Sequence, residues 1–213
     1  MPKFCFENGK QLLILYELFD KVEVHSLRVV SVNIGEKRTI TFNNRTVETG
    51  IFKRPAEGSI FLDSEHVRGD TISDRKHHGG VDQAVYGYSA IHYSYWGKKY
   101  DLVNKNYGVF GENITFSELE ETEIHLGNVY RCGGIRIQAA GPRIPCFKLG
   151  IVFKTQHIVK EFWQTTKCGV YFKVLKGGEV RSGDVFVLEK ENTNQPTIAE
   201  LFQEHRPKSI NCE

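Results

Sequence analysis

Alternating apolar and polar positions follow the first 26 residues and predict a succession of short β-strands. Residues 27–34 are apolar and β-branched, residues 38–42 alternate, and residues 60–62 form a third short run. Asn43-Asn44 and Glu57-Gly58 supply turn residues between these runs. Many short strands at this spacing favour a β-barrel or a β-sandwich.

The second half of the chain continues the β pattern. Residues 124–140 indicate two strands joined around Cys132-Gly133-Gly134, and further strands are predicted over residues 169–175 and 184–188. A last short helix is predicted over residues 197–203, directly after a proline that can begin it. No internal repeat interrupts this order, so one domain over residues 27–213 is the simplest interpretation.

Helical spacing predicts two more helices. One covers residues 89–100 and directs Ile91, Tyr95 and Trp96 toward the core. The other covers residues 155–166. Its apolar stripe consists of Ile158, Val159, Phe162 and Trp163. The predicted fold is therefore mainly β, with a few short helices.

Residues 1–26 differ from the rest of the chain. Residues 11–19 can form a short helix, but a helix of this length is unstable in water unless it packs against something. We therefore expect residues 1–26 to be an extension, helical or disordered, that precedes the domain.

Composition excludes several classes of protein. The chain has 213 residues, is 40% hydrophobic and 25% charged, and carries a formal net charge of only +2, which is too small to indicate a nucleic-acid polymer as partner. No apolar stretch reaches the roughly 18 residues of a membrane span. Five cysteines with no C-x-x-C pair encode neither a disulfide framework nor a structural zinc site. We expect a cytoplasmic protein.

The cysteine at position 146 lies in an unusual loop. Pro142 and Pro145 stiffen the backbone before it, and Arg143 and Lys148 bracket it with positive charge, which favours the thiolate. An extended backbone after Pro145 would place Cys146 and Lys148 on one face. A buried structural cysteine in an ordinary loop is the alternative interpretation.

A glycine pair marks a second candidate site. Gly79 and Gly80 allow the backbone to approach a ligand and to cradle an anion with its N–H groups, and His78 and Asp82 flank them. Adjacent histidines at this point cannot both face one way in a strand, so a two-histidine metal site is not favoured. The alternative is a polar hairpin turn.

Two further segments carry polar side chains. Lys53 and Arg54 precede Pro55 at a predicted strand end, where a charged pair is often simply solvated. Asn113 ends a glycine-rich loop and has an amide that donates and accepts hydrogen bonds at once. The chain lacks G-x-G-x-x-G and G-x-x-x-x-G-K-[ST], so neither a dinucleotide nor a nucleoside triphosphate site is indicated.

Taken together, these segments resemble the MOSC domain family, named after the C-terminal domain of molybdenum-cofactor sulfurases, and especially its bacterial YiiM-like members. The matching residues, in the order of the family, are Ile51-Phe52-Lys53 with Pro55, Gly69-Asp70 with Asp74, His78-Gly79-Gly80 with Asp82, Gly111-Glu112-Asn113, Pro142-Arg143 with Pro145-Cys146 and Lys148, and Gly183-Asp184. Residues 1–26 and a short tail after Pro196 depart from the family pattern.

The resemblance implies a closed, mostly antiparallel β-barrel and a molybdenum-pterin cofactor (molybdopterin form). It implies that Cys146 is the sulfur ligand of molybdenum or the carrier of a sulfur atom, and that the substrates are small N-hydroxylated bases and related N-oxygenated compounds. It also carries an association with pyridoxal phosphate.

The chemistry of the residues agrees with this expectation. A thiolate is the soft ligand that molybdenum requires, and Lys53, Arg54 and Arg143 are candidates for the cofactor phosphate. The remaining cofactor-binding candidates are His78, Gly79, Gly80, Asp82, Asn113 and Lys148. Because no nicotinamide site is indicated, electrons for a reductase must come from a separate donor protein. Two alternatives stay open: a carrier of cofactor or persulfide without turnover, and an interaction domain with no cofactor.

Overall fold

The computed structural model of this protein describes residues 26–71, 80–102 and 106–208. The predicted extension lies outside the described residues apart from Ser26, and so do His78 and Gly79. The strands are β1 (Ser26–Ile34), β2 (Arg38–Phe42), β3 (Arg45–Thr49), β4 (Arg54–Pro55), β5 (Ser59–Leu62), β6 (Val85–Ser89), β7 (Ile114–Phe116), β8 (Val129–Cys132), β9 (Ile135–Pro142), β10 (Val170–Lys176), β11 (Gly178–Arg181) and β12 (Val185–Lys190).

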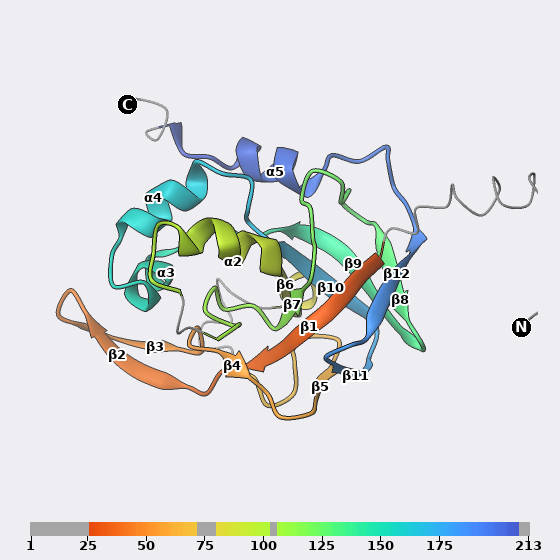
Figure 1. Cartoon of the computed structure of the whole chain (residues 1–213), viewed down its shortest axis with the longest axis horizontal. Helices are drawn as coiled ribbons and strands as arrows, with labels where there is room; N and C mark the ends of the chain where they lie inside the picture. The colour runs from red at the N-terminus through yellow and green to blue at the C-terminus, as the bar shows by residue number, and fades with distance from the viewer. Residues whose placement is uncertain (1–25, 72–79, 103–105, 209–213) are drawn as a thin grey trace, which may run out of the picture.

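Seven of these strands close into a barrel. Their order is β12-β8-β9-β10-β6-β7-β1, and β1 pairs again with β12 to complete the circle (Figure 1). Neighbouring strands are antiparallel except β6 and β7, which are parallel. β4 extends the sheet beside β1, while β5 pairs with β11 outside the barrel. The prediction of a mostly antiparallel closed barrel is confirmed.

Four α-helices and one 3-10 turn accompany the barrel in the described part of the chain. They are η1 (Val81–Gln83), α2 (Ala90–Gly97), α3 (Phe147–Val152), α4 (His157–Trp163) and α5 (Ile198–Glu204). Helices α2, α3 and α4 lie together on one side of the barrel (Figure 1). Within the described residues, no helix is long and apolar enough to span a membrane.

The helix after Ser89 forms as predicted, with Trp96 buried, but two details of the helices differ from the sequence interpretation. The helix that follows Ser89 ends at Gly97, and Ile91 is 46% exposed because His92 and Trp96 occupy the buried face of α2. The backbone does not remain extended after Pro145, since α3 begins at Phe147 and Cys146 is its N-cap residue. Lys148 lies inside the helix whereas Cys146 precedes it, so no extended backbone places both side chains on one face.

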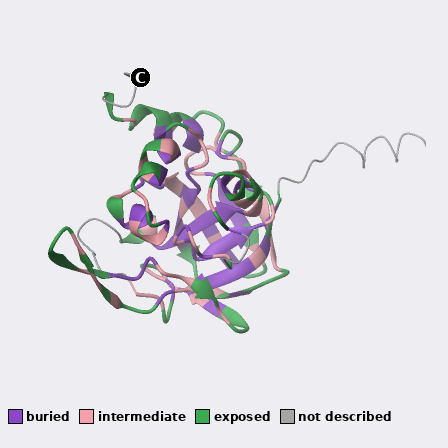
Figure 2. Ribbon diagram, turned by 60° about the vertical axis from the view of Figure 1, so that its left-hand side comes forward, coloured by how far each residue is buried: buried purple, intermediate pink, exposed green. Residues whose placement is uncertain are grey.

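The core combines β-branched and aromatic side chains. Residues buried inside the barrel and beneath the helices are coloured purple in Figure 2. Trp96 of α2 stacks on Phe162 of α4 with ring centroids 5.8 Å apart, which ties the helices together. Gly87 lies in the middle of β6, where a Cβ atom would come within 2.8 Å of the rings of Phe116 and Phe172. Strand β6 can therefore lie close against these rings only with glycine at this position.

The β2–β3 hairpin extends from the barrel below α3 (Figure 1). Asn43 and Asn44 both have positive φ, at 49° and 59°, which is the conformation of a two-residue type I′ turn. The predicted turn at Asn43-Asn44 is confirmed. The partner strand β3 was not predicted.

Candidate functional site

The predicted site residues belong to segments that strand pairing brings side by side. Asn33 near the end of β1 donates its backbone N–H to Asn113, and Asn113 in turn donates to the carbonyl of Tyr86 in β6. Tyr86 is the pairing partner of Tyr171, which is also paired with Gly141. One hydrogen-bonded row thus joins five segments and ends directly before the Cys146 loop.

Arg143 connects this loop to the rest of the row. It follows the last residue of β9, is only 6% exposed, and donates from Nη1 to the carbonyl of Phe110 over 2.7 Å. Its guanidinium lies 5.1 Å from the ring centroid of Tyr86. Burial alone would lower the pKa of Arg143, but Tyr86, Tyr171 and Cys146 raise it above its ordinary value. Arg143 is therefore a permanent buried cation close to Cys146.

Lys53 forms a buried ion pair with Asp70. The two side chains are 8% and 4% exposed. Asp70 also accepts hydrogen bonds from the backbone of Gly35 at 2.8 Å and from Nδ2 of Asn113 at 2.9 Å. Burial lowers the pKa of Lys53, and the opposing effect of Asp70 limits the shift. The charge of Lys53 is largely balanced inside the protein, so Arg143 is the less compensated cation.

The side-chain amide of Asn113 makes contacts within the protein. Its Oδ1 accepts from the backbone N–H of Tyr86 at 3.2 Å, while Nδ2 donates to Asp70. Both ends of the amide thus hold neighbouring segments in place. Asn113 therefore positions β1, β6 and Asp70 relative to one another, and its role as a cofactor-binding residue stays a prediction.

Glu112 is a buried carboxylate that the sequence reasoning did not select. Its Oε1 accepts from Tyr93 Oη at 2.5 Å, from the Gly108 N–H at 2.8 Å and from Thr115 Oγ1 at 2.8 Å. Its Oε2 is buried and has no hydrogen-bond partner among the described residues. Burial raises the pKa of Glu112, although these three donors oppose the shift. Lys53 is close enough for the charge of Glu112 to raise the pKa of the lysine.

Four other predicted residues belong to the part of the chain that the structure describes. Arg54 is exposed in β4, and Gly80 is exposed at the start of η1 with φ of 95°. The Asp82 side chain is 75% exposed and its oxygen lies 3.8 Å from Lys173. Lys148 is buried in α3. Of the predicted set, the structure gathers Lys53, Asn113, Arg143 and Cys146.

Sequence reasoning also missed Tyr86 and Tyr171. Their partners lie far away in the chain, and no local pattern indicates that strand register places them beside Arg143. Glu112 and Asp70 did carry a signal, because each follows a glycine with positive φ in a quoted motif. In both segments the signal is an acidic residue directly after a glycine in a turn.

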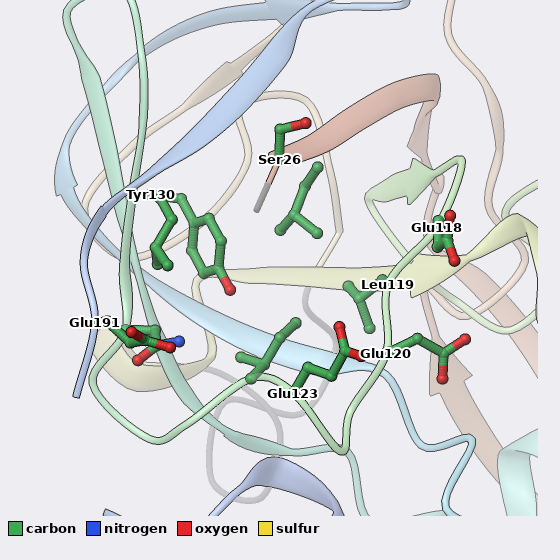
Figure 3. Close-up of a pocket in the computed structure, with 11 residues that line it drawn as sticks. Ser26, Glu118, Leu119, Glu120, Glu123, Tyr130 and Glu191 are labelled. Atoms are coloured by element: carbon green, nitrogen blue, oxygen red, sulfur yellow. The ribbon is translucent and has the colours of Figure 1, made fainter. Parts of the chain in front are cut away.

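A separate hollow lies at the opposite end of β1. Its volume is about 180 Å³, and four glutamates surround an apolar floor that includes Leu119 and Tyr130 (Figure 3). The glutamates are Glu118, Glu120, Glu123 and Glu191. None of the predicted site residues lines it. Among the described residues, the hollow is thus lined by acids without a lysine or arginine, whereas the other end of β1 combines the buried cations Lys53 and Arg143 with the buried acids Asp70 and Glu112.

The described residues can hold a metal-pterin group only if the protein supplies a single metal ligand. Within the described residues, no three His, Cys, Asp or Glu side chains gather to bind a metal by themselves. A metal here would have to bring most of its own ligands and take a single thiolate from Cys146, as the pterin dithiolene group allows. The unpartnered Oε2 of Glu112 and the guanidinium of Arg143 supply an acceptor and a donor nearby. The residues present fit such a group.

Comparison with known proteins agrees with this geometry. The MOSC domain model matches residues 74–187. The uncharacterized protein YflK of Bacillus subtilis is 38% identical over 155 residues, which cover 73% of this chain and 70% of YflK. The crystal structure of YiiM from Geobacillus stearothermophilus matches with a TM-score of 0.68 and 29% sequence identity. The match covers 86% of this chain and 88% of the YiiM chain. The chain therefore belongs to the MOSC domain family and is YiiM-like.

A third relative is named for an activity. A protein called "Reductase" from Gibberella moniliformis is 29% identical over 67% of this chain, but the match covers only 26% of the fungal protein. The larger part of that protein has no counterpart in the matched region. The family to which this chain belongs is associated with the molybdenum cofactor.

Proposed function

We propose that this protein is a molybdenum-cofactor-dependent reductase of small N-hydroxylated bases and related N-oxygenated compounds. The observation that carries the proposal is the position of Cys146 beside a buried cation, Arg143, in a YiiM-like barrel. The fungal relative named as a reductase supports the reaction class. The pyridoxal phosphate association has no support of this kind.

The reaction has a simple balance. The N–O bond of the substrate breaks, its oxygen leaves as water, and the nitrogen keeps a hydrogen, which consumes two electrons and two protons. A bound molybdenum-pterin cofactor would supply the two-electron chemistry. The electrons would come from a separate donor protein, since the chain has no nicotinamide motif.

The protein's own residues bind and orient. Cys146 would provide a soft sulfur ligand, and Arg143 would stabilise both the thiolate and the anionic part of the cofactor. Lys53, Asp70 and Asn113 hold the surrounding loops through the buried bonds described above. Because Asp70 already balances Lys53, we assign phosphate binding mainly to Arg143.

Metal content tests the ligand assignment. We expect Cys146→Ser to lose molybdenum and pterin fluorescence while keeping the circular dichroism of the wild type, since a serine hydroxyl is a hard and mostly protonated ligand. Cys132→Ser is the matched control, because Cys132 lies at the end of β8 away from the cluster. Full molybdenum in a well-folded Cys146→Ser protein would contradict the assignment.

Turnover tests the reaction class. Benzamidoxime or N-hydroxylated adenine should be reduced with a reduced viologen dye, and not with NADH alone. Cofactor-loaded protein that turns over neither substrate with either donor would favour the carrier hypothesis. Rapid turnover with NADH alone would show that the chain holds a nicotinamide site and needs no separate donor.

A further inference from the structure

An apolar surface surrounds the Cys146 loop. Few large apolar side chains are exposed in the described residues, and two of them, Ile144 at 38% and Phe147 at 39%, lie on either side of Cys146. Solvent exposure of apolar side chains is costly, and exposed apolar patches usually mark binding surfaces. This loop is therefore a candidate binding surface if further apolar side chains adjoin it.

The β2–β3 hairpin extends this apolar surface. Phe42 stacks on Phe147 with ring centroids 5.2 Å apart and an angle of 26° between the ring planes. Phe42 pairs with Arg45, and Ile40 pairs with Val47, so all four side chains lie on one face of the hairpin. On this face Ile40, Phe42 and Val47 are half-buried and Arg45 is exposed, whereas the opposite face is exposed and polar. Its exposed residues are Thr39, Thr41, Thr46 and Glu48.

A hollow lies at this contact. Its volume is about 530 Å³, within the usual range for small-molecule sites, and it is lined by Phe42, Asn43, Arg45, Val47 and Phe147. The lining combines two stacked rings with one guanidinium. A flat aromatic ligand satisfies both, because it can stack on a ring and accept a cation over its face. An aliphatic ligand with the same polar head gains neither contact.

We propose that the β2–β3 hairpin and Phe147 form an aromatic wall (Phe42, Arg45, Val47 and Phe147) that selects flat aromatic N-oxygenated compounds for the Cys146 site. This inference rests on the proposed function. It adds that the ring of the substrate, beyond its N–OH group, determines which compounds bind. The hairpin is outside the barrel, so its sequence can vary without disturbing the strands that hold Arg143.

Direct binding tests the wall without requiring turnover. Purified protein of known molybdenum content is titrated with benzamidoxime and with acetamidoxime, which share the amidoxime head and differ in the ring, and binding is followed by calorimetry or saturation-transfer NMR. We expect Phe42→Ala and Phe147→Ala each to weaken benzamidoxime about three- to tenfold, from the loss of one aromatic contact. Acetamidoxime should change less than about twofold.

Two controls keep the result interpretable. Phe42→Tyr keeps the ring and should retain wild-type affinity, which excludes a mere folding defect in the alanine variant. Phe61→Ala removes another partly buried phenylalanine, which lies under Arg68 at 3.8 Å in the β5–β11 pair, away from the wall. Its affinity for both ligands should equal that of the wild type.

The outcomes separate this inference from the proposed function. Ring-selective binding with no turnover would support the wall and contradict the reductase. Turnover with equal affinity for both ligands, or no measurable binding of benzamidoxime, would overturn the wall. A wild-type dimer that Phe42→Ala dissociates, seen by light scattering, would also overturn it, because the apolar face would then belong to a protein interface.

Discussion

Glu112 offers a sharp test of how the site is held together. Glu112→Ala removes the acceptor of three hydrogen bonds and leaves the buried N–H of Gly108 without a partner. Each lost hydrogen bond costs about 1 kcal/mol, and the unpaired buried N–H of Gly108 adds about 1–3 kcal/mol. The predicted loss in the free energy of unfolding is therefore about 4–6 kcal/mol. Glu112→Gln keeps an oxygen at Oε1 and replaces only the unpartnered Oε2, so we expect a change within about 1 kcal/mol at neutral pH.

The same residue predicts a pH dependence with a definite sign. The folded protein raises the pKa of Glu112 above its ordinary value of 4.5 because burial disfavours the charged form. The folded state therefore binds the proton more tightly than the unfolded state. The stability that this carboxyl contributes is full below pH 4.5 and is lost as pH rises through the folded pKa. The loss is about 1.4 kcal/mol for each unit by which the folded pKa exceeds the unfolded pKa. Because glutamine does not titrate, the Glu112→Gln protein should not show this fall in stability with rising pH.

Urea unfolding at a series of pH values measures both effects. The two tryptophans, at 0% and 6% exposure, report the transition by fluorescence. The wild type should lose stability relative to Glu112→Gln as pH rises from 4.5 to 8. A glutamine variant as unstable as the alanine variant would refute the assignment of stability to Oε1. Parallel pH profiles would refute the argument that burial raises the pKa of the carboxyl.

Three further predictions follow from the fold. Lys53→Met leaves Asp70 as an uncompensated buried charge and should cost about 3–5 kcal/mol, whereas Arg136→Gln at an exposed pair should cost less than about 1 kcal/mol, both by urea unfolding. Phe162→Ala removes a fully buried ring from the helix cluster and should cost about 3–5 kcal/mol by the same measurement. A chain that begins at His25 should keep its molybdenum content and melting temperature, and a fall in either would show that the removed residues 1–24 pack on the barrel.

Local pattern was sufficient for the strands that alternate. A few neighbouring residues are enough to predict a strand from Leu27 to Ile34 and a turn from Cys132 to Gly134. Strand β1 forms over the first segment, and β8 and β9 form on either side of the turn. Strand β6 was missed because all five of its residues are buried, so it shows no alternation. Helix α3 was missed because its six residues are too few for a helical period.

The site was only partly predictable for a different reason. Lys53, Asn113 and Arg143 stand in short motifs beside glycine or proline, so their types and spacing identify them. Their partners depend on strand register: Asp70 contacts Asn113 across 43 positions in the chain, and Phe110 contacts Arg143 across 33. No pattern within one segment encodes such a pairing. It follows only from the closed barrel.

The closure of the barrel by β1 and β12 has a consequence for synthesis. Ser26 pairs with Val187, 161 residues later in the chain. A ribosome must therefore make nearly all of the described chain before the circle can close, and until then β1 presents backbone groups that another chain can bond. Contacts between such distant segments form slowly. A nascent chain that stalls before residue 185 would keep this edge open, and binding by a chaperone would then protect it from aggregation.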